Sequence, residues 1–117
     1  MIIPRKRECI SEESLINIKQ DPINQDWFSI CFFNILDENF IREYQEYMEW
    51  FPISLNQILS EEFIIEFQDK VDWYYISWHQ RLSIKFITEI SHRINYNLLM
   101  LNKNIDNDVK DFCRMFV

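Results

Sequence analysis

Histidines and cysteines are the side chains in this sequence that most often hold metals or act as nucleophiles. His79 and His92 do not belong to a cluster of cysteines and carboxylates with the spacing of a common metal site. The cysteines, Cys9, Cys31 and Cys113, are odd in number and form no Cys-x-x-Cys pair. We therefore expect reduced thiols, with Cys31 and Cys113 buried, and histidines in turns or at the surface.

Carboxylates are abundant, and paired carboxylates are the groups that general acid–base catalysis uses. Such catalysis needs two carboxylates in unlike environments beside a pocket. Here the acidic residues gather where helices are expected to begin and where the helix dipole favours negative charge. The sequence contains no Gly-x-Ser-x-Gly, no His-Glu-x-x-His and, with no glycine at all, no phosphate-binding loop. The sequence therefore predicts a non-enzyme that uses no cofactor and no metal.

An aromatic cluster and an acidic stretch are the candidate binding residues. A short helix cannot bury Tyr74, Tyr75 and Trp78 together, so at least one ring should be exposed, and exposed rings mark binding surfaces. Burial against a neighbouring helix is the alternative for each ring. From position 37 to 72 there are ten acidic and two basic residues. A solvated helix surface is the simpler explanation, and a surface for a basic partner is the other. The acidic candidates are Glu61, Glu62, Glu66 and Asp69.

These residues stand in a pattern that returns every 23 positions and predicts a row of equivalent helices. The period is marked by an aliphatic residue followed by a helix-capping residue: Leu36-Asp37, Leu59-Ser60, Leu82-Ser83 and Ile105-Asp106. Phenylalanine and isoleucine stand three and four positions after each of the first three caps, on one face of a helix. The pattern predicts an amphipathic helix of about ten residues in each period.

A second helix is expected in each period, beginning at a large aromatic residue. A capping-type residue precedes each ring: Asp26-Trp27, Glu49-Trp50, Asp72-Trp73 and Asn95-Tyr96. An aliphatic residue three positions after the ring predicts a helix of about seven residues. Gln57 and Gln80 then occupy the turns into the next period.

The sequence thus predicts one all-α domain, residues 1–117, built of two-helix repeats of 23 residues. Its parts are a degenerate unit 11–33, units 34–56, 57–79 and 80–102, and a half unit 103–117 that repeats the first helix alone. Weak outer units suit a stacked array, because an end unit has no neighbour on one side. We expect a small solenoid or compact helical array, with a helical bundle as the alternative.

Composition narrows the class of protein. Hydrophobic residues make up 48% of the chain, which argues against intrinsic disorder. A net charge of −7 disfavours direct binding to nucleic acid or to anionic lipid. There is no apolar run of membrane-spanning length, and the N-terminus lacks the apolar region of a signal peptide. The Arg5-Lys6-Arg7 cluster is too short for more than a weak basic patch. We expect a cytoplasmic protein that is not secreted.

The amino-acid sequence of the middle of the chain resembles a short tandem helical repeat. The resemblance covers residues 34–90 and is most specific at Leu59-Ser60-Glu61-Glu62-Phe63-Ile64, Asp69-Lys70-Val71-Asp72-Trp73 and Ile76-Ser77. The family comprises uncharacterised repeat proteins of large DNA viruses that infect amoebae, of phages and of low-GC bacteria. It implies a helical repeat and a viral source, and it carries no catalytic residue over to this chain.

Three hypotheses about function follow. The first is a protein-interaction module that binds a protein partner, basic in character, through an acidic and aromatic face. The second is a virus- or phage-encoded inhibitor that mimics the phosphate rows of a nucleic acid and occludes a basic groove of a host enzyme. The third is a virion or assembly protein that self-associates head to tail.

Overall fold

The helices begin at residues whose side chains accept hydrogen bonds from free backbone N–H groups. In the computed structural model, which describes residues 8–117, such caps open most of the helices; the Arg5-Lys6-Arg7 cluster lies outside the described residues. Seven side chains accept from a backbone N–H two or three positions on: Ser11, Asp26, Asp37, Ser60, Asp72, Ser83 and Asn95. Glu49 and Asp106 stand at the same kind of position without a side-chain bond to a helix N–H.

The described residues form nine α-helices with short 3-10 helices and two very short strands. The α-helices are α1 (Glu12–Gln20), α2 (Trp27–Phe33), α3 (Glu38–Glu43), α4 (Trp50–Asn56), α5 (Glu61–Glu66), α6 (Trp73–His79), α7 (Ile84–Glu89), α8 (Tyr96–Leu101) and α9 (Asn107–Cys113). The 3-10 helices are η1 (Gln45–Tyr47), η2 (Ser91–Arg93) and η3 (Arg114–Phe116). The predicted all-α class is confirmed. None of the helices in residues 8–117 has the length and apolarity that a membrane span requires.

The first helix of each period is shorter than the sequence suggested. α3, α5 and α7 each have six residues. The residues that follow them are Tyr44, Phe67 and Ile90, whose φ of −107° to −115° and ψ near 25° leave the helical region. η1 or a turn then carries the chain to Met48 and Val71, and η2 carries it to Ile94. The predicted ten-residue helix was therefore wrong. The apolar stripe continues through the tighter turn, so that Met48, Val71 and Ile94 are buried as well. The second helices have six or seven residues, as expected.

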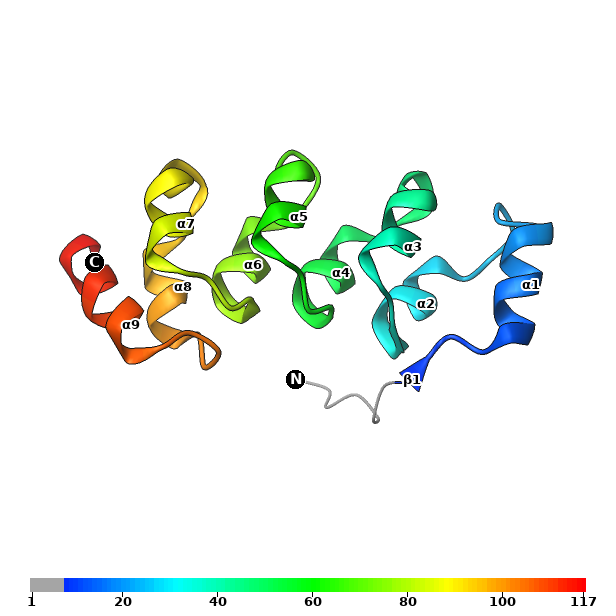
Figure 1. Ribbon diagram of the computed structural model, residues 1–117, viewed down its shortest axis with the longest axis horizontal. Coiled ribbons are helices and arrows are strands. Elements are labelled where there is room, and N and C mark those ends of the chain that lie inside the picture. Colours follow the sequence, from blue (N-terminus) through cyan, green and yellow to red (C-terminus); the bar gives the residue numbers. More distant parts are fainter. Residues whose placement is uncertain (1–7) are drawn as a thin grey trace.

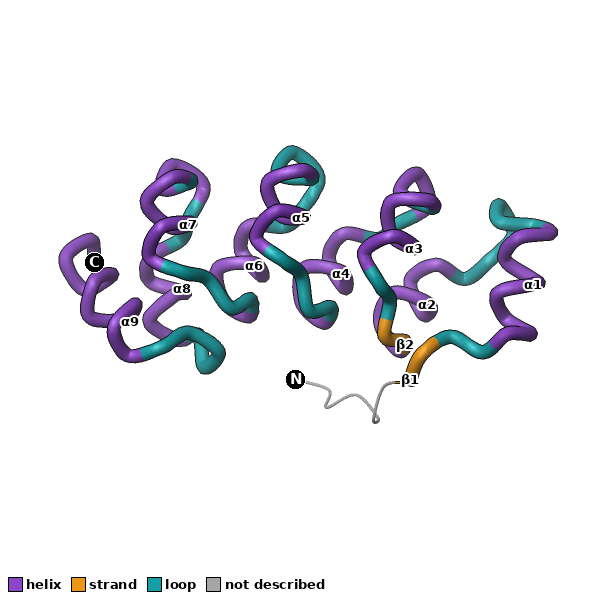
Figure 2. The backbone as a smooth tube through the Cα atoms, viewed as in Figure 1, coloured by secondary structure: helices purple, strands orange, loops and turns teal. Residues whose placement is uncertain are grey.

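The helices lie in two rows along the long axis of the molecule (Figures 1 and 2). α3, α5 and α7 form one row, and α2, α4, α6 and α8 form the other, in which each helix packs on the next. The core runs between the rows and contains the stripe residues of both, such as Ile41, Phe63, Ile76 and Leu99. The centre of α4 and α6 carries a small buried residue, Ser54 or Ser77, which permits close approach of neighbouring helices.

Buried side-chain amides tie each stretch of the second row to the next. Gln80 donates from Nε2 to the carbonyl oxygens of Ser54 and Gln57, at 2.9 and 2.6 Å, and its Oε1 accepts from Leu59 N–H at 3.1 Å. Gln57 makes the same three bonds one period earlier, to Cys31 O, Asn34 O and Leu36 N–H. Asn102 repeats the two donor bonds, to Ser77 O and Gln80 O. Backbone groups at the turns therefore find partners without a sheet.

The two strands are a parallel pair of two residues each, β1 (Glu8–Cys9) and β2 (Asn34–Ile35). Glu8 is in register with Asn34, and Cys9 with Ile35. The pair joins the segment that leads into α1 to the segment that leads into α3. Gln57 in turn joins the segment that leads into α3 to the segment that leads into α5.

Candidate partner-binding surface

The second row of helices carries a continuous chain of aromatic rings on its outer side. Phe28 of α2 stacks on Phe32 and on Phe51 of α4, with ring centroids 5.8 and 6.4 Å apart. Phe51 meets Tyr75 of α6 edge-on at 4.6 Å. Tyr75 in turn contacts Tyr74 at 5.1 Å and Trp78 at 6.4 Å. We call this set the aromatic face: Phe28, Phe32, Phe51, Tyr74, Tyr75 and Trp78.

Several rings of the aromatic face are open to solvent. Phe28, Phe51 and Tyr74 keep exposed fractions of 48%, 37% and 49%. Tyr75 and Trp78 are half-buried. The expectation that at least one of the three candidate rings on α6 is exposed is therefore confirmed for Tyr74. The helices α2, α4 and α6 contain no Lys, Arg, Asp or Glu, in a chain of which 26% is charged.

The tryptophans at the start of these helices have a different role. Trp27 is buried, Trp50 and Trp73 are partly buried, and all three pack against the core. The indole N–H of Trp27 donates to Pro22 O at 2.7 Å, and that of Trp73 to Gln68 O at 2.9 Å. All three rings pack between the rows, and the polar edges of Trp27 and Trp73 have a hydrogen-bond partner. The three tryptophans therefore belong to the scaffold.

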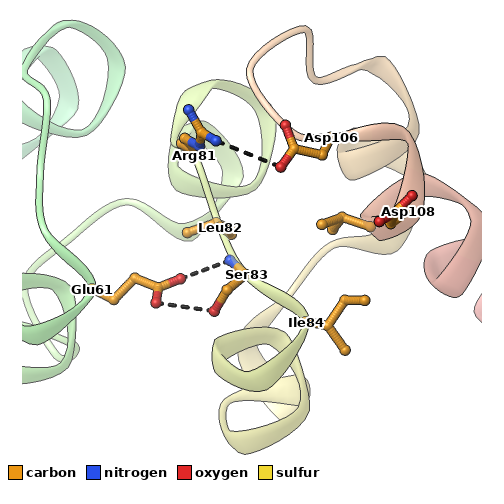
Figure 3. Close-up of a pocket in the computed structure, with 8 residues that line it drawn as sticks. Glu61, Arg81, Leu82, Ser83, Ile84, Asp106 and Asp108 are labelled. Atoms are coloured by element: carbon orange, nitrogen blue, oxygen red, sulfur yellow. Dashed lines mark hydrogen bonds and ion pairs between the residues drawn. The ribbon is translucent and has the colours of Figure 1, made fainter.

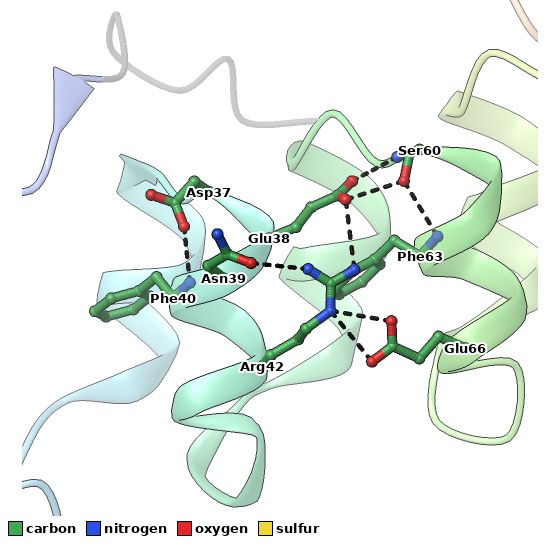
Figure 4. A network of polar contacts seen from close by, with 8 residues as sticks. All are labelled: Asp37, Glu38, Asn39, Phe40, Arg42, Ser60, Phe63 and Glu66. Atoms are coloured by element: carbon green, nitrogen blue, oxygen red, sulfur yellow. Dashed lines mark hydrogen bonds and ion pairs between the residues drawn. The ribbon is translucent and has the colours of Figure 1, made fainter.

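The acidic candidates on and after α5 are largely engaged within the molecule. Glu61 accepts both the backbone N–H and the hydroxyl of Ser83, at 2.7 and 3.0 Å (Figure 3). Glu66 accepts from Nε of Arg42 at 3.0 and 3.2 Å (Figure 4). Asp69 accepts from Arg93 at 2.6 Å. Glu62 is exposed. We call Glu38, Glu61, Glu66 and Asp69 the bridging carboxylates.

Glu38 shows how these bridges join neighbouring helices of the first row. Its two oxygens accept from the backbone N–H and the hydroxyl of Ser60 at 2.7 and 2.9 Å, while Arg42 lies 3.8 Å away (Figure 4). The Arg42 guanidinium also lies 5.3 Å from the centre of the Phe63 ring. Because Ser60 caps α5 in the same network, the carboxylate holds the start of one helix against the helix before it. Structural contacts thus account for much of the acidity of this row.

The two groups of candidates predicted from the sequence do not share a row. Glu61, Glu62 and Glu66 belong to α5, whereas the three candidate rings belong to α6 (Figure 1). The rings instead join Phe28, Phe32 and Phe51, which sequence reasoning missed. The signal was present, because Phe28 and Phe51 precede Tyr74 by two periods and one period of 23 residues.

Two hollows on the described surface are open to solvent. One of about 420 Å³ lies where α5, the turn before α7 and α9 meet; Arg81 and Asp106 form an ion pair of 3.5 Å at its rim (Figure 3). Another of about 440 Å³ lies between α1 and α3 and is lined by Leu15, Ile16 and Phe40 among others.

Burial shifts the pKa values of two cysteines and one histidine by removing water from around them. Desolvation raises the pKa of the Cys31 thiol to about 11, and burial also raises the pKa of Cys113. Both thiols are free and buried, as expected, whereas Cys9 is exposed. Burial lowers the pKa of His79, whose Nε2 has no hydrogen-bond partner among the described residues. Within residues 8–117, no group of three or more His, Cys, Asp or Glu side chains is placed to hold a metal ion.

Comparison with known proteins gives no match: no protein-family model, no curated protein and no solved structure matches this chain. The resemblance to viral, phage and low-GC bacterial repeat proteins therefore stays a prediction.

Proposed function

We propose that the chain is a non-catalytic, tandem-repeat solenoid that binds a protein partner through the aromatic face. The repeat is supported by contacts that recur at one period, such as those of Gln57 and Gln80. In such an array each unit offers a similar patch, so that binding sums several modest contacts.

The observation that carries this function is the exposed, uncharged aromatic face. Three helices in succession present rings where a solvated surface would carry charge, and the rings form one continuous chain across α2, α4 and α6. Aromatic residues are enriched and charged residues depleted at the centre of protein interfaces. The rings lose little conformational entropy on binding, because neighbouring rings already hold them.

The hypothesis of an inhibitor that mimics nucleic acid is less well supported than binding through the aromatic face, because of the contacts that the carboxylates make. That hypothesis needs rows of free carboxylates, whereas Glu61, Glu66 and Asp69 are held by Ser83, Arg42 and Arg93. Glu66 and Asp69, each paired with an arginine, present less net charge to a partner than free carboxylates would.

Site-specific photocrosslinking tests the proposed function. Benzoylphenylalanine is placed at Phe51 or Tyr74, and as a control at exposed Thr88 of α7 in the first row, in the full chain. Irradiation in a lysate of the cells that naturally make the protein should yield a discrete cross-linked protein from Phe51 and Tyr74 and none from Thr88. The same bands from Thr88, or no bands from Phe51 and Tyr74, would contradict the proposal.

A further inference from the structure

The aromatic face is bordered by carboxylates along one edge. Asp26, Glu49 and Asp72 immediately precede α2, α4 and α6, and we call them the acidic border. Two positions after each carboxylate stands an exposed ring: Phe28, Phe51 or Tyr74. Each of three successive helices therefore presents one carboxylate beside one ring, and the pair is repeated along the row.

Hydrogen bonds hold two of these carboxylates at the start of their helices. Asp72 Oδ1 accepts from the backbone N–H of Tyr74 at 3.1 Å, so it lies at the base of the Tyr74 side chain. Asp26 accepts from the hydroxyl of Ser29 at 2.7 Å and from its backbone N–H at 3.2 Å. Those bonds lower the pKa of Asp26, the hydroxyl contributing most, so this carboxylate stays ionised at neutral pH.

The acidic border differs from most of the bridging carboxylates in one respect. Glu38, Glu66 and Asp69 each lie beside an arginine of the chain, whereas Glu61 accepts from Ser83. Within residues 8–117, the ion pairs of the chain include none of Asp26, Glu49 and Asp72. The helices that they border contain no lysine or arginine to neutralise them. The negative charge of this edge is therefore available to pair with a cationic group from another molecule.

We infer that the aromatic face with its acidic border binds a cationic amphipathic segment of a partner protein. Lysine or arginine side chains of the partner would meet the carboxylates and lie over the rings beside them, and its apolar side chains would cover the rest of the ring chain. The inference rests on the proposed function and specifies the chemistry of the partner.

Charge argues against two other occupants of this surface. A second copy docked through the same face would bring together two chains that each have a net charge of −7. An anionic membrane would repel the same edge, although rings of this kind can enter a lipid interface. A cationic protein segment satisfies both the rings and the border.

Fluorescence anisotropy with defined probes tests the inference on the full chain. The probe is a labelled helical peptide of leucine and lysine in an amphipathic pattern, and its counterpart has glutamate at every lysine. The border variant is Asp26→Asn, Glu49→Gln and Asp72→Asn; asparagine already caps α8, so these helices should keep their starts. The matched control, Glu12→Gln, Glu13→Gln and Glu89→Gln, removes the same charge from exposed helix positions outside the second row.

The lysine probe should bind wild type at least about tenfold more tightly than the glutamate probe. The border variant should lose about tenfold of that affinity, the sum of three modest ionic contacts, and the control less than about twofold. Equal binding of the two probes, an equal loss in both variants, or preferential binding to phosphatidylserine vesicles would overturn the inference. Should the lysine probe fail while benzoylphenylalanine at Phe51 still cross-links a protein, only the partner's chemistry is wrong and the proposed function stands.

Discussion

At the scale of the residue, what a side chain touches decides its role more than its chemical type does. Glu61 and Glu62 are neighbours of one type at the start of α5. Glu61 reaches Ser83 across to the next helix, whereas Glu62 is exposed. One is a structural contact and the other is free to be a surface charge.

Replacing these neighbouring glutamates should therefore separate the two roles. We expect Glu61→Ala to lower the free energy of unfolding by about 1 kcal/mol, because the N-cap Ser83 loses the acceptor of its hydroxyl and its backbone N–H. Glu62→Ala, the control on the same helix, should change it by less than about 0.5 kcal/mol. Urea titration followed by circular dichroism measures both, and equal losses would contradict the assignment.

His79 should make stability depend on pH. Burial lowers its pKa below the usual 6.5, so the unfolded chain binds this proton more readily than the folded chain does. Stability from this group is present above pH 6.5 and is lost as the pH falls through 6.5 towards the lower pKa of the folded state.

Melting temperatures at pH 8 and pH 5.5 test this expectation. Wild type should lose more than the His79→Asn variant between the two values, and His92→Asn should behave as wild type does. Parallel losses in all three proteins would show that the histidine is not responsible.

At the scale of the element, buried side-chain amides join successive turns of the second row. Gln57 and Gln80 each satisfy two carbonyl oxygens and one N–H of the preceding turn. Buried backbone groups without partners are costly, so these residues fix how far apart successive helices of the second row can lie.

Removing one amide should destabilise the whole row. Gln80→Met keeps the length of the side chain but leaves Ser54 O, Gln57 O and Leu59 N–H without this partner, and we expect a loss of about 2–4 kcal/mol. Gln20→Met, at the exposed end of α1, is the matched control and should cost less than about 0.5 kcal/mol. Equal free energies of unfolding would show that the amides are dispensable.

The observed helices also show which features of the fold could be predicted from the sequence. The apolar stripes and caps were sufficient to predict the all-α class and the starts of the second helices, because those signals are local. The short length of α3, α5 and α7 was missed, since a stripe at helical spacing continues through the turn at Tyr44, Phe67 and Ile90. The partners of Gln57, Glu61 and Glu66 lie 21 to 26 residues away, and no local pattern announces such contacts.

At the scale of the whole molecule, the two rows give an elongated body of 50 × 28 × 17 Å. Its radius of gyration is 15.5 Å, whereas a compact domain of this length would have about 13 Å. The elongation favours the proposed row of stacked helices over the helical bundle that the sequence left as an alternative.

Small-angle X-ray scattering of the monomer tests the elongated shape. We expect a radius of gyration near 15.5 Å and a distance distribution with a long tail. A value near 13 Å with a symmetric distribution, measured at several concentrations, would instead indicate a bundle.

The direction of the amide bonds has a consequence for synthesis on the ribosome. The carbonyl groups of Cys31 and Asn34 accept hydrogen bonds from Gln57, which is synthesised later. Those of Ser54 and Gln57 accept from Gln80, which is later still. A nascent chain leaves the ribosome with its N-terminus first. Each helix pair therefore lacks its amide hydrogen bonds until the following pair has left the exit tunnel. Acquisition of structure during translation should therefore lag the emerging chain by one pair of helices, and a pause in translation would leave the last exposed pair, and only that pair, open to proteases.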